Sequence, residues 1–355
     1  MSLRRWLLVA LSFALAFGVS LWVVVSSWPH GGGALSLPGR AHLAALVLTS
    51  GEILARAVKL MWCARALRFH LALRPAIRTT LGGDFGAAIT PSRSGSEPAR
   101  FLILSEAQVA TANTLLLLFT ELALEAASLA IVAVLLVMIF PHAGGALASV
   151  VGVVGGYAVF VLSTIAVGTL LARRRAHGPP PRWAEAIGLH AGRWRGVQRA
   201  IRQLRDGVRA ARTADKRWLI GALVVSVLHV VARISILPAL VYAATSNVRL
   251  APLVLWPLAL SYGAGVAPAP GGGGVIEVVY RATLGSVIPP ALLGASLVWW
   301  RFYTFYLPML LGAIIAGRAV LRAVRDRPAH GRRHEARLLA PREPIASTVP
   351  DDHRE

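Results

Sequence analysis

The chain has 355 residues, of which 56% are hydrophobic and 15% charged, compared with about 25% charged residues in an average soluble protein. A net charge of +21 would suit a nucleic-acid-binding protein, but the basic residues stand between long apolar stretches, so we expect no nucleic-acid partner. The single cysteine, Cys63, excludes an internal disulfide framework and a cysteine-rich metal site. These features predict a membrane protein.

The apolar stretches, in chain order, predict an all-α polytopic membrane protein with about six full transmembrane helices. The first, Trp6 to Trp28, carries no charge over 23 residues and is long enough for a hydrocarbon core of about 30 Å. A cleaved signal peptide has a shorter apolar region, so we expect a retained anchor. The remaining five spans are expected at about 43–62, 107–140, 143–172, 218–244 and 282–317.

Basic residues predict the orientation of these spans, because cytoplasmic loops are enriched in Lys and Arg. Arg4 and Arg5 precede the first span, and residues 173–217 carry thirteen Lys or Arg against three acids. We therefore expect the N-terminus, the 173–217 loop and the C-terminus to be cytoplasmic. From residue 193 onward the loop has apolar side chains at helical intervals, which is typical either of an amphipathic helix on anionic lipid headgroups or of a solvated linker helix.

The loop separates two membrane halves, 1–172 and 218–318, and each half contains one segment that is irregular at membrane depth. Residues 79–104 and 250–288 both run through proline and glycine or serine into a glutamate. We interpret them as re-entrant helical hairpins, entered from opposite sides of the membrane and therefore arranged as an inverted repeat. Chance is the alternative, since Gly and Pro are common in this chain. Residues 319–355 have prolines and no apolar period, which predicts a disordered cytoplasmic tail.

Irregular backbone at membrane depth must be buried in protein or line a polar cavity, because lipid offers no hydrogen-bond partners. In the second segment we expect breaks at Pro252, Pro257, Pro268, Pro270 and the glycine run 271–274. A broken helix also presents free N–H groups and a positive dipole end, which favour an anion such as a phosphate. The residues that we expect to bind a substrate headgroup are Arg93, Ser94, Gly95, Glu97, Arg100, Arg233, Gly271, Gly272, Gly273, Gly274, Glu277 and Arg301.

Charged residues within apolar spans are also functional candidates, since each costs about 2.5–3.5 kcal/mol to insert. Glu52 and Arg56 lie four residues apart, as do Glu121 and Glu125, so each pair occupies one helix face. Paired carboxylates raise one another's proton affinity, which would suit the coupling of transport to protons. The structural alternative is that these residues form fixed ion pairs that hold the bundle together.

Two further features each have two interpretations. His229 lies four residues before Arg233 and is either a headgroup ligand or a hydrogen-bonding residue between helices. The aromatic residues around Arg301 predict either an interfacial belt or a phosphate site beside acyl chains. The sequence shows no metal-ligand spacing and no Ser/His/Asp arrangement, so we expect no cofactor, no metal and no enzymatic activity.

The second irregular segment contains the run Pro268-Ala269-Pro270-Gly271-Gly272-Gly273-Gly274-Val275-Ile276-Glu277. At this motif the sequence resembles the flippase-like transmembrane family that includes the N-terminal membrane region of lysylphosphatidylglycerol synthase, the multiple peptide resistance factor. The first motif, Pro91 to Glu97, has serines where the family has glycine or leucine. The likeness covers most of residues 1–320. It implies a multi-pass protein of the bacterial inner membrane that moves a lipid between leaflets.

The resemblance implies that the substrate is an anionic phospholipid, a polyprenyl-phosphate-linked lipid or a hopanoid-related amphiphile, because family members also accompany hopanoid synthesis. Larger members carry a cytoplasmic aminoacyl-transferase domain. Only a short tail follows the spans here, so lipid aminoacylation is not expected. Two alternatives stay open: a non-transporting scaffold for a lipid-modifying enzyme, and a membrane-embedded lipid or glycosyl transferase. We expect membrane lipids with anionic headgroups as partners, and a lipid-modifying enzyme as a possible one.

Overall fold

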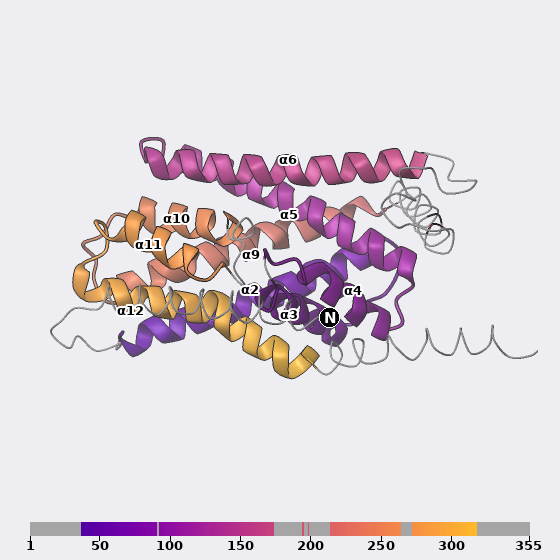
Figure 1. The fold of residues 1–355 in the computed structure, drawn as a ribbon, viewed down its shortest axis with the longest axis horizontal. Coiled ribbons are helices and arrows are strands. Elements are labelled where there is room, and N and C mark those ends of the chain that lie inside the picture. The colour runs from indigo at the N-terminus through magenta and orange to yellow at the C-terminus, as the bar shows by residue number, and fades with distance from the viewer. Residues whose placement is uncertain are drawn as a thin grey trace, which may run out of the picture.

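The computed structural model describes residues 37–90, 92–173, 194, 198, 214–263 and 272–317, and every regular element in these ranges is helical (Figure 1). The helices are α2 (Gly39–Ala66), α3 (Leu73–Ala88), α4 (Ser96–Glu106), α5 (Thr111–Ile139), α6 (Gly145–Arg173), α9 (Lys216–Tyr242), α10 (Leu250–Gly263), α11 (Val275–Leu284) and α12 (Pro290–Arg301). A π-helical turn, Phe302–Tyr306, follows α12, and the helix then continues to Gly317. The predicted first span, most of the basic loop and the tail lie outside the described residues.

Four helices in the described ranges are long and apolar enough to cross a membrane: Thr111–Ile139, Gly145–Thr164, Lys216–Tyr242 and Pro290–Gly317. They coincide with four of the six predicted spans. A fifth predicted span lies within α2, which has 28 residues but carries Glu52, Arg56 and Lys59 in its middle. The all-helical class is therefore confirmed for the described part of the chain.

The outer surface of these helices is apolar. On α6, which runs along one edge of the molecule in Figure 1, Val159, Phe160 and Leu162 are 64%, 62% and 64% exposed. On α5, Met138 is 73% exposed. A contiguous apolar face of this kind would promote aggregation in water. In a bilayer it is the surface that contacts acyl chains.

The centre of the molecule is an antiparallel pair, α2 and α9, which make the most extensive helix contact in the described part. At one end, Arg40 Nε and Nη2 donate to the carbonyl of Ala243 at 3.0 and 2.6 Å. At the other end, the N–H of Asp215 donates to the carbonyl of Ala66 at 3.0 Å. A helical hairpin follows each member of the pair, α3–α4 after α2 and α10–α11 after α9. The two hairpins therefore begin at opposite ends of the pair (Figure 1).

The first hairpin has arms of 16 and 11 residues, which reach only about 24 and 17 Å. The arms cross at Gly86 and Gly95, where a Cβ atom on Gly86 would lie 2.5 Å from the Gly95 carbonyl oxygen. Thr90 Oγ1 ties the turn: it donates to the carbonyl of Gly86 at 2.8 Å and accepts from the N–H of Gly95 at 2.7 Å. Ser92 and Arg93 both have positive φ, 51° and 57°, which costs a non-glycine residue about 1–2 kcal/mol. The tip that carries Arg93 is thus a strained turn.

The second hairpin corrects one prediction. Pro252 and Pro257 do not break α10, which runs unbroken over 14 residues. Pro252 lies in the first turn, where its missing N–H needs no partner within the helix, and Pro257 is accommodated inside the helix. The interruption comes later, before α11, where Gly274 has a φ of 82°. Only glycine adopts this conformation readily.

Candidate functional site

Three arginines line a small cavity, and residues of both hairpins form part of its wall. Arg93 comes from the turn of the first hairpin, Arg233 from α9 and Arg301 from the end of α12. The remaining lining residues come from the second hairpin and from the α12 region, and they are Ser261, Ile276, Trp300, Thr304 and Phe305. The cavity measures about 20 Å³, which holds roughly one water molecule.

Arg301 is oriented by Glu277. Its Nε lies 3.0 Å from Glu277 Oε1, and the two residues are only 5% and 1% exposed. The other carboxylate oxygen of Glu277 accepts from the N–H of Gly274 at 2.7 Å and caps the first turn of α11. The Arg301 guanidinium also lies 4.6 Å from the centroid of the Phe305 ring, a cation–π contact. The glutamate that opens α11 therefore holds a cavity arginine in place.

Arg233 connects the cavity with the π-helical turn. Its Nη1 donates to Glu52 Oε1 at 3.0 Å, and its Nη2 donates to the carbonyl of Thr304 at 3.2 Å. Thr304 lies within Phe302–Tyr306, where the change in hydrogen-bond register leaves a carbonyl available to a donor outside the helix. Short π-helical turns of this kind are frequent at functional sites.

Several donors around the cavity lack an acceptor. Among the described residues, the Arg93 guanidinium forms no ion pair within 4 Å, whereas Arg233 and Arg301 each have a carboxylate partner. In the same part of the chain, Arg233 Nε and Trp300 Nε1 are buried without a hydrogen-bond partner. Buried polar groups without partners are rare in native proteins. The excess of donors and of positive charge fits an anion with several acceptor oxygens.

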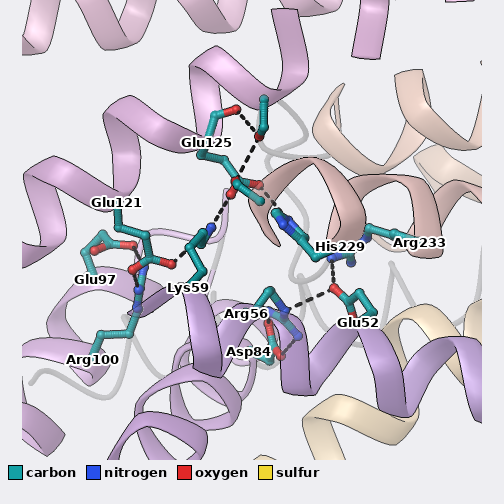
Figure 2. Close-up of polar contacts among 12 residues, drawn as sticks. Glu52, Arg56, Lys59, Asp84, Glu97, Arg100, Glu121, Glu125, His229 and Arg233 are labelled. Atoms are coloured by element: carbon teal, nitrogen blue, oxygen red, sulfur yellow. Dashed lines mark hydrogen bonds and ion pairs between the residues drawn. The ribbon is translucent and has the colours of Figure 1, made fainter. Parts of the chain in front are cut away.

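Figure 2 shows two groups of charged residues inside the helix bundle, and the first of them includes the cavity residue Arg233. In the first group, Glu52 Oε1 lies 3.0 Å from Arg233 Nη1 and 3.0 Å from Arg56 Nε. Arg56 also forms a two-bond ion pair with Asp84 of α3, at 2.9 and 2.7 Å. The structure thus contains the pair expected between Glu52 and Arg56, as part of a network that joins α2, α3 and α9.

The second group centres on Lys59, whose Nζ lies 3.3 Å from Glu121 Oε1 and 2.5 Å from Glu125 Oε2. Glu121 also pairs with Arg100, which in turn reaches Glu97 at 3.1 Å. Lys59 is 1% exposed, whereas the Glu97 side chain is 58% exposed. This group therefore runs from the middle of the bundle to its surface.

A family model for the lysylphosphatidylglycerol synthase transmembrane region matches residues 5–312 of the chain. The chain belongs to this family. A search of curated proteins finds no match. The resemblance expected from the proline- and glycine-rich motif is thereby confirmed. Together with the four span-like helices, it identifies a multi-pass membrane protein whose family is named for the membrane region of a lipid-modifying enzyme.

Within this family member, the structure brings together some of the predicted headgroup residues. Arg93, Arg233 and Arg301 line one cavity, and Glu277 contacts Arg301. Three of the predicted glycines, Gly272, Gly273 and Gly274, form the turn before α11, while Gly271 lies outside the described residues. Ser94 and Gly95 belong to the turn before α4.

Two predicted headgroup residues lie elsewhere. Arg100 does not line the cavity, because α4 directs it toward α5, where Glu121 and Glu97 provide carboxylates. Glu97 lies in the first turn of α4, as Glu277 lies in the first turn of α11, but the Glu97 side chain is exposed. The interfacial belt is also wrong for Trp300 and Tyr303, which are 2% and 6% exposed. These rings pack inside the bundle instead.

Sequence reasoning missed three contributors. Asp84 was detectable as the lone charge between Arg78 and Arg93, in a stretch of small and apolar residues. Ser261 and Tyr262 carry no comparable signal, because only the folded hairpin places them beside the cavity and beside Glu125.

Proposed function

We propose that this protein is a flippase-type transporter that moves a lipid with an anionic, phosphate-bearing headgroup between the leaflets of the bacterial inner membrane. The observation that carries the proposal is the three-arginine cavity between the two hairpins. An anionic phospholipid is the substrate class that we favour. A polyprenyl-phosphate-linked lipid offers the same headgroup chemistry.

Guanidinium groups suit this role because they present a planar fork of donors that matches phosphate oxygens. Arg93 brings a positive charge with no carboxylate partner in the described residues, and Arg233 Nε and Trp300 Nε1 bring donors without acceptors. A phosphate would satisfy all three. The first turn of α11 also lies beside the cavity, at Ile276, so its positive dipole end adds to the attraction for an anion.

The arrangement of the hairpins supports an inverted repeat. Each half has the order long helix, short hairpin, long helix: α2, α3–α4, α5 in the first and α9, α10–α11, α12 in the second. Because α2 and α9 are antiparallel, the hairpins begin at opposite ends, yet both reach the same cavity. Interrupted helices that meet between two inverted halves are a common plan for a transport site that opens alternately to each side. We take both hairpins as re-entrant, with six full spans around them.

For the orientation we propose that residues 173–217 and both termini lie in the cytoplasm, because cytoplasmic loops are enriched in Lys and Arg. Single-cysteine scanning tests this directly, because Cys63 is the only native cysteine and is buried. In a Cys63→Ala background, membrane-impermeant reagents should label cysteines in 173–217 only from the cytoplasmic side. Labelling from the periplasm would overturn the span count.

The transport test uses the full-length protein in phosphatidylcholine liposomes that contain fluorescent phosphatidylglycerol. Dithionite quenching of the outer leaflet reports movement between leaflets. Wild-type protein should accelerate this movement, and Arg93→Gln should slow it severalfold without loss of folded protein, since Arg93 has no ion pair to lose within the described residues. Arg249→Gln is the matched control, because it makes the same change at an exposed position outside the cavity. Equal slowing in both variants would remove the cavity from the mechanism.

Two further measurements identify the molecule that is transported. Uptake of labelled inorganic phosphate into the same liposomes separates a lipid headgroup from a free anion, and we expect no uptake. Recovery of chemically unchanged phosphatidylglycerol separates transport from a transferase reaction. A modified lipid in this second measurement would favour the enzyme alternative.

A further inference from the structure

Glu125 lies at a junction of four helices. Its carboxylate, on α5, lies 2.5 Å from Lys59 Nζ on α2 and accepts from the Tyr262 hydroxyl on α10 at 2.9 Å. His229 Nε2, on α9, lies 3.3 Å from the same oxygen that Tyr262 contacts. A single carboxylate therefore ties α10, one arm of the second hairpin, to the rest of the bundle.

The Glu125–His229 pair has capacity for one more proton. His229 is 1% exposed, and its Nδ1 has no hydrogen-bond partner in the described residues. The Glu125 side chain keeps 18% exposure, so its carboxylate is not sealed inside the bundle. Without this extra proton the buried charges cancel, because the two carboxylates of Glu121 and Glu125 pair with the two cations Lys59 and Arg100.

The other helices that surround this pair contribute further groups. The α2 helix also supplies Glu52, which pairs with Arg56 and Arg233, and α6 supplies Tyr157, whose ring packs edge-on against Tyr262 with centroids 6.2 Å apart. On α9 itself, Arg233 lies one turn beyond His229. None of these groups is a second acceptor for His229 Nδ1 in the described part of the chain.

The same residues adjoin the arginine cavity. Ser261, next to Tyr262 in the chain, forms part of its wall, and Arg233 forms another part. At about 20 Å³ the cavity admits roughly one water molecule, which is less than a phosphate group with its five heavy atoms needs. A headgroup can enter only if a wall moves. The wall at Ser261 is held by the hydrogen bond from Tyr262 to Glu125.

We propose that the Glu125–His229 pair binds the proton that drives lipid passage, and that this proton loosens α10 so that the arginine cavity can admit an anionic headgroup. The inference rests on the proposed function and adds its energy source. A proton on the pair weakens the attraction of Glu125 for Lys59 and Tyr262 and adds positive charge beside the cavity. The proton enters from water on one side and leaves to water on the other, together with one negative charge on the lipid.

Linkage gives the sign of the pH dependence. If protonation favours the open cavity, headgroup binding must favour protonation by the same factor. Affinity for the lipid should therefore rise as pH falls and decline as pH rises. For a single coupled proton, the change is at most about tenfold per pH unit.

The binding experiment titrates detergent-solubilised full-length protein with short-chain phosphatidylglycerol between about pH 5 and 8, the range in which histidine titrates. Wild-type affinity should fall severalfold as pH rises. Glu125→Gln, which resembles the protonated carboxylate, should bind tightly with no pH dependence. Tyr262→Phe keeps the proton site but removes the tether, so it should bind more tightly than wild type at high pH, with a smaller slope. Glu106→Gln, the same change in an exposed pair with Arg78, should keep the wild-type profile.

The transport experiment compares liposomes with and without an imposed pH gradient. The gradient should speed wild-type movement of labelled phosphatidylglycerol severalfold but leave the Glu125→Gln rate unchanged. Wild-type movement that ignores the gradient, with a wild-type pH profile in both Glu125→Gln and Tyr262→Phe, would overturn proton coupling while leaving transport intact. Absence of both binding and movement at every pH would overturn the proposed function itself and this inference with it.

Discussion

Replacing Glu277 with glutamine tests whether the buried pair with Arg301 organises the cavity. Both residues are at most 5% exposed and their charged atoms lie 3.0 Å apart. With an effective dielectric constant of about 20, Coulomb's law gives an attraction of roughly 5 kcal/mol at that distance. Removal of one partner from a buried pair typically costs about 3–5 kcal/mol, because the other charge stays buried without compensation. The glutamine oxygen can still accept from the Gly274 N–H, so the helix cap should survive.

A double-mutant cycle isolates the pair from its surroundings. Glu277→Gln and Arg301→Gln should each lower the free energy of unfolding, and the double variant should be less destabilised than the sum, with a coupling of about 2–3 kcal/mol. Unfolding can be followed with a thiol-reactive fluorescent dye, since the only cysteine, Cys63, is fully buried in the native state. Additive effects, within about 0.5 kcal/mol, would refute the ion pair.

The cycle also has a functional measurement. Glu277→Gln removes a negative charge beside Arg301 at the cavity, so phosphatidylglycerol should bind more tightly and leave more slowly. Movement between leaflets should fall while affinity rises. Glu106→Gln is the control, because its pair with Arg78 is partly exposed. Loss of both affinity and movement would show that Glu277 contacts the substrate in a different way.

Three further predictions concern stability and use the same Cys63 dye measurement. Gly274→Ala should lower the free energy of unfolding by about 1–2 kcal/mol, because Gly274 has a φ of 82°. Gly51 is a helical glycine with nothing within 4 Å of an added Cβ, so Gly51→Ala should be neutral or stabilising by up to about 1 kcal/mol. Equal effects of the two substitutions would contradict this reasoning. Gly86→Ala should cost about 1–3 kcal/mol, since its Cβ would push the arms of the first hairpin apart, and an unchanged midpoint would argue against the close crossing. Lys59→Met should lower the free energy of unfolding by about 3–5 kcal/mol, and Arg78→Gln should lower it by at most about 1 kcal/mol. A larger effect of Arg78→Gln would contradict the burial of Lys59.

Much of the fold could be predicted because hydropathy and helix length are local properties. The spans at 107–140, 143–172, 218–244 and 282–317 correspond to helices in the structure. The two proline- and glycine-containing segments contain pairs of short helices, α3–α4 and α10–α11. Pro257 was misjudged, because whether a helix tolerates proline depends on neighbouring groups that the sequence does not reveal.

The site could be predicted only in part. Residue type and membrane depth singled out Arg93, Arg233 and Arg301, which line one cavity in the structure, because intramembrane arginines are costly and few. They did not reveal that Arg100 faces α5, because the direction of a side chain depends on the phase of its helix and on the carboxylate of Glu121. Pairings between distant helices follow from packing and not from spacing.

The balance of buried charges distinguishes a functional site from a structural one. If the intramembrane charges served only to hold helices together, each cation should have its own acid. Five of the cations do have carboxylate partners within 4 Å, and they are Arg56, Lys59, Arg100, Arg233 and Arg301. Arg93, by contrast, has no carboxylate partner in the described part of the chain and sits on a strained turn beside two other arginines. A cation placed at such cost without a partner favours a ligand that supplies the missing negative charge.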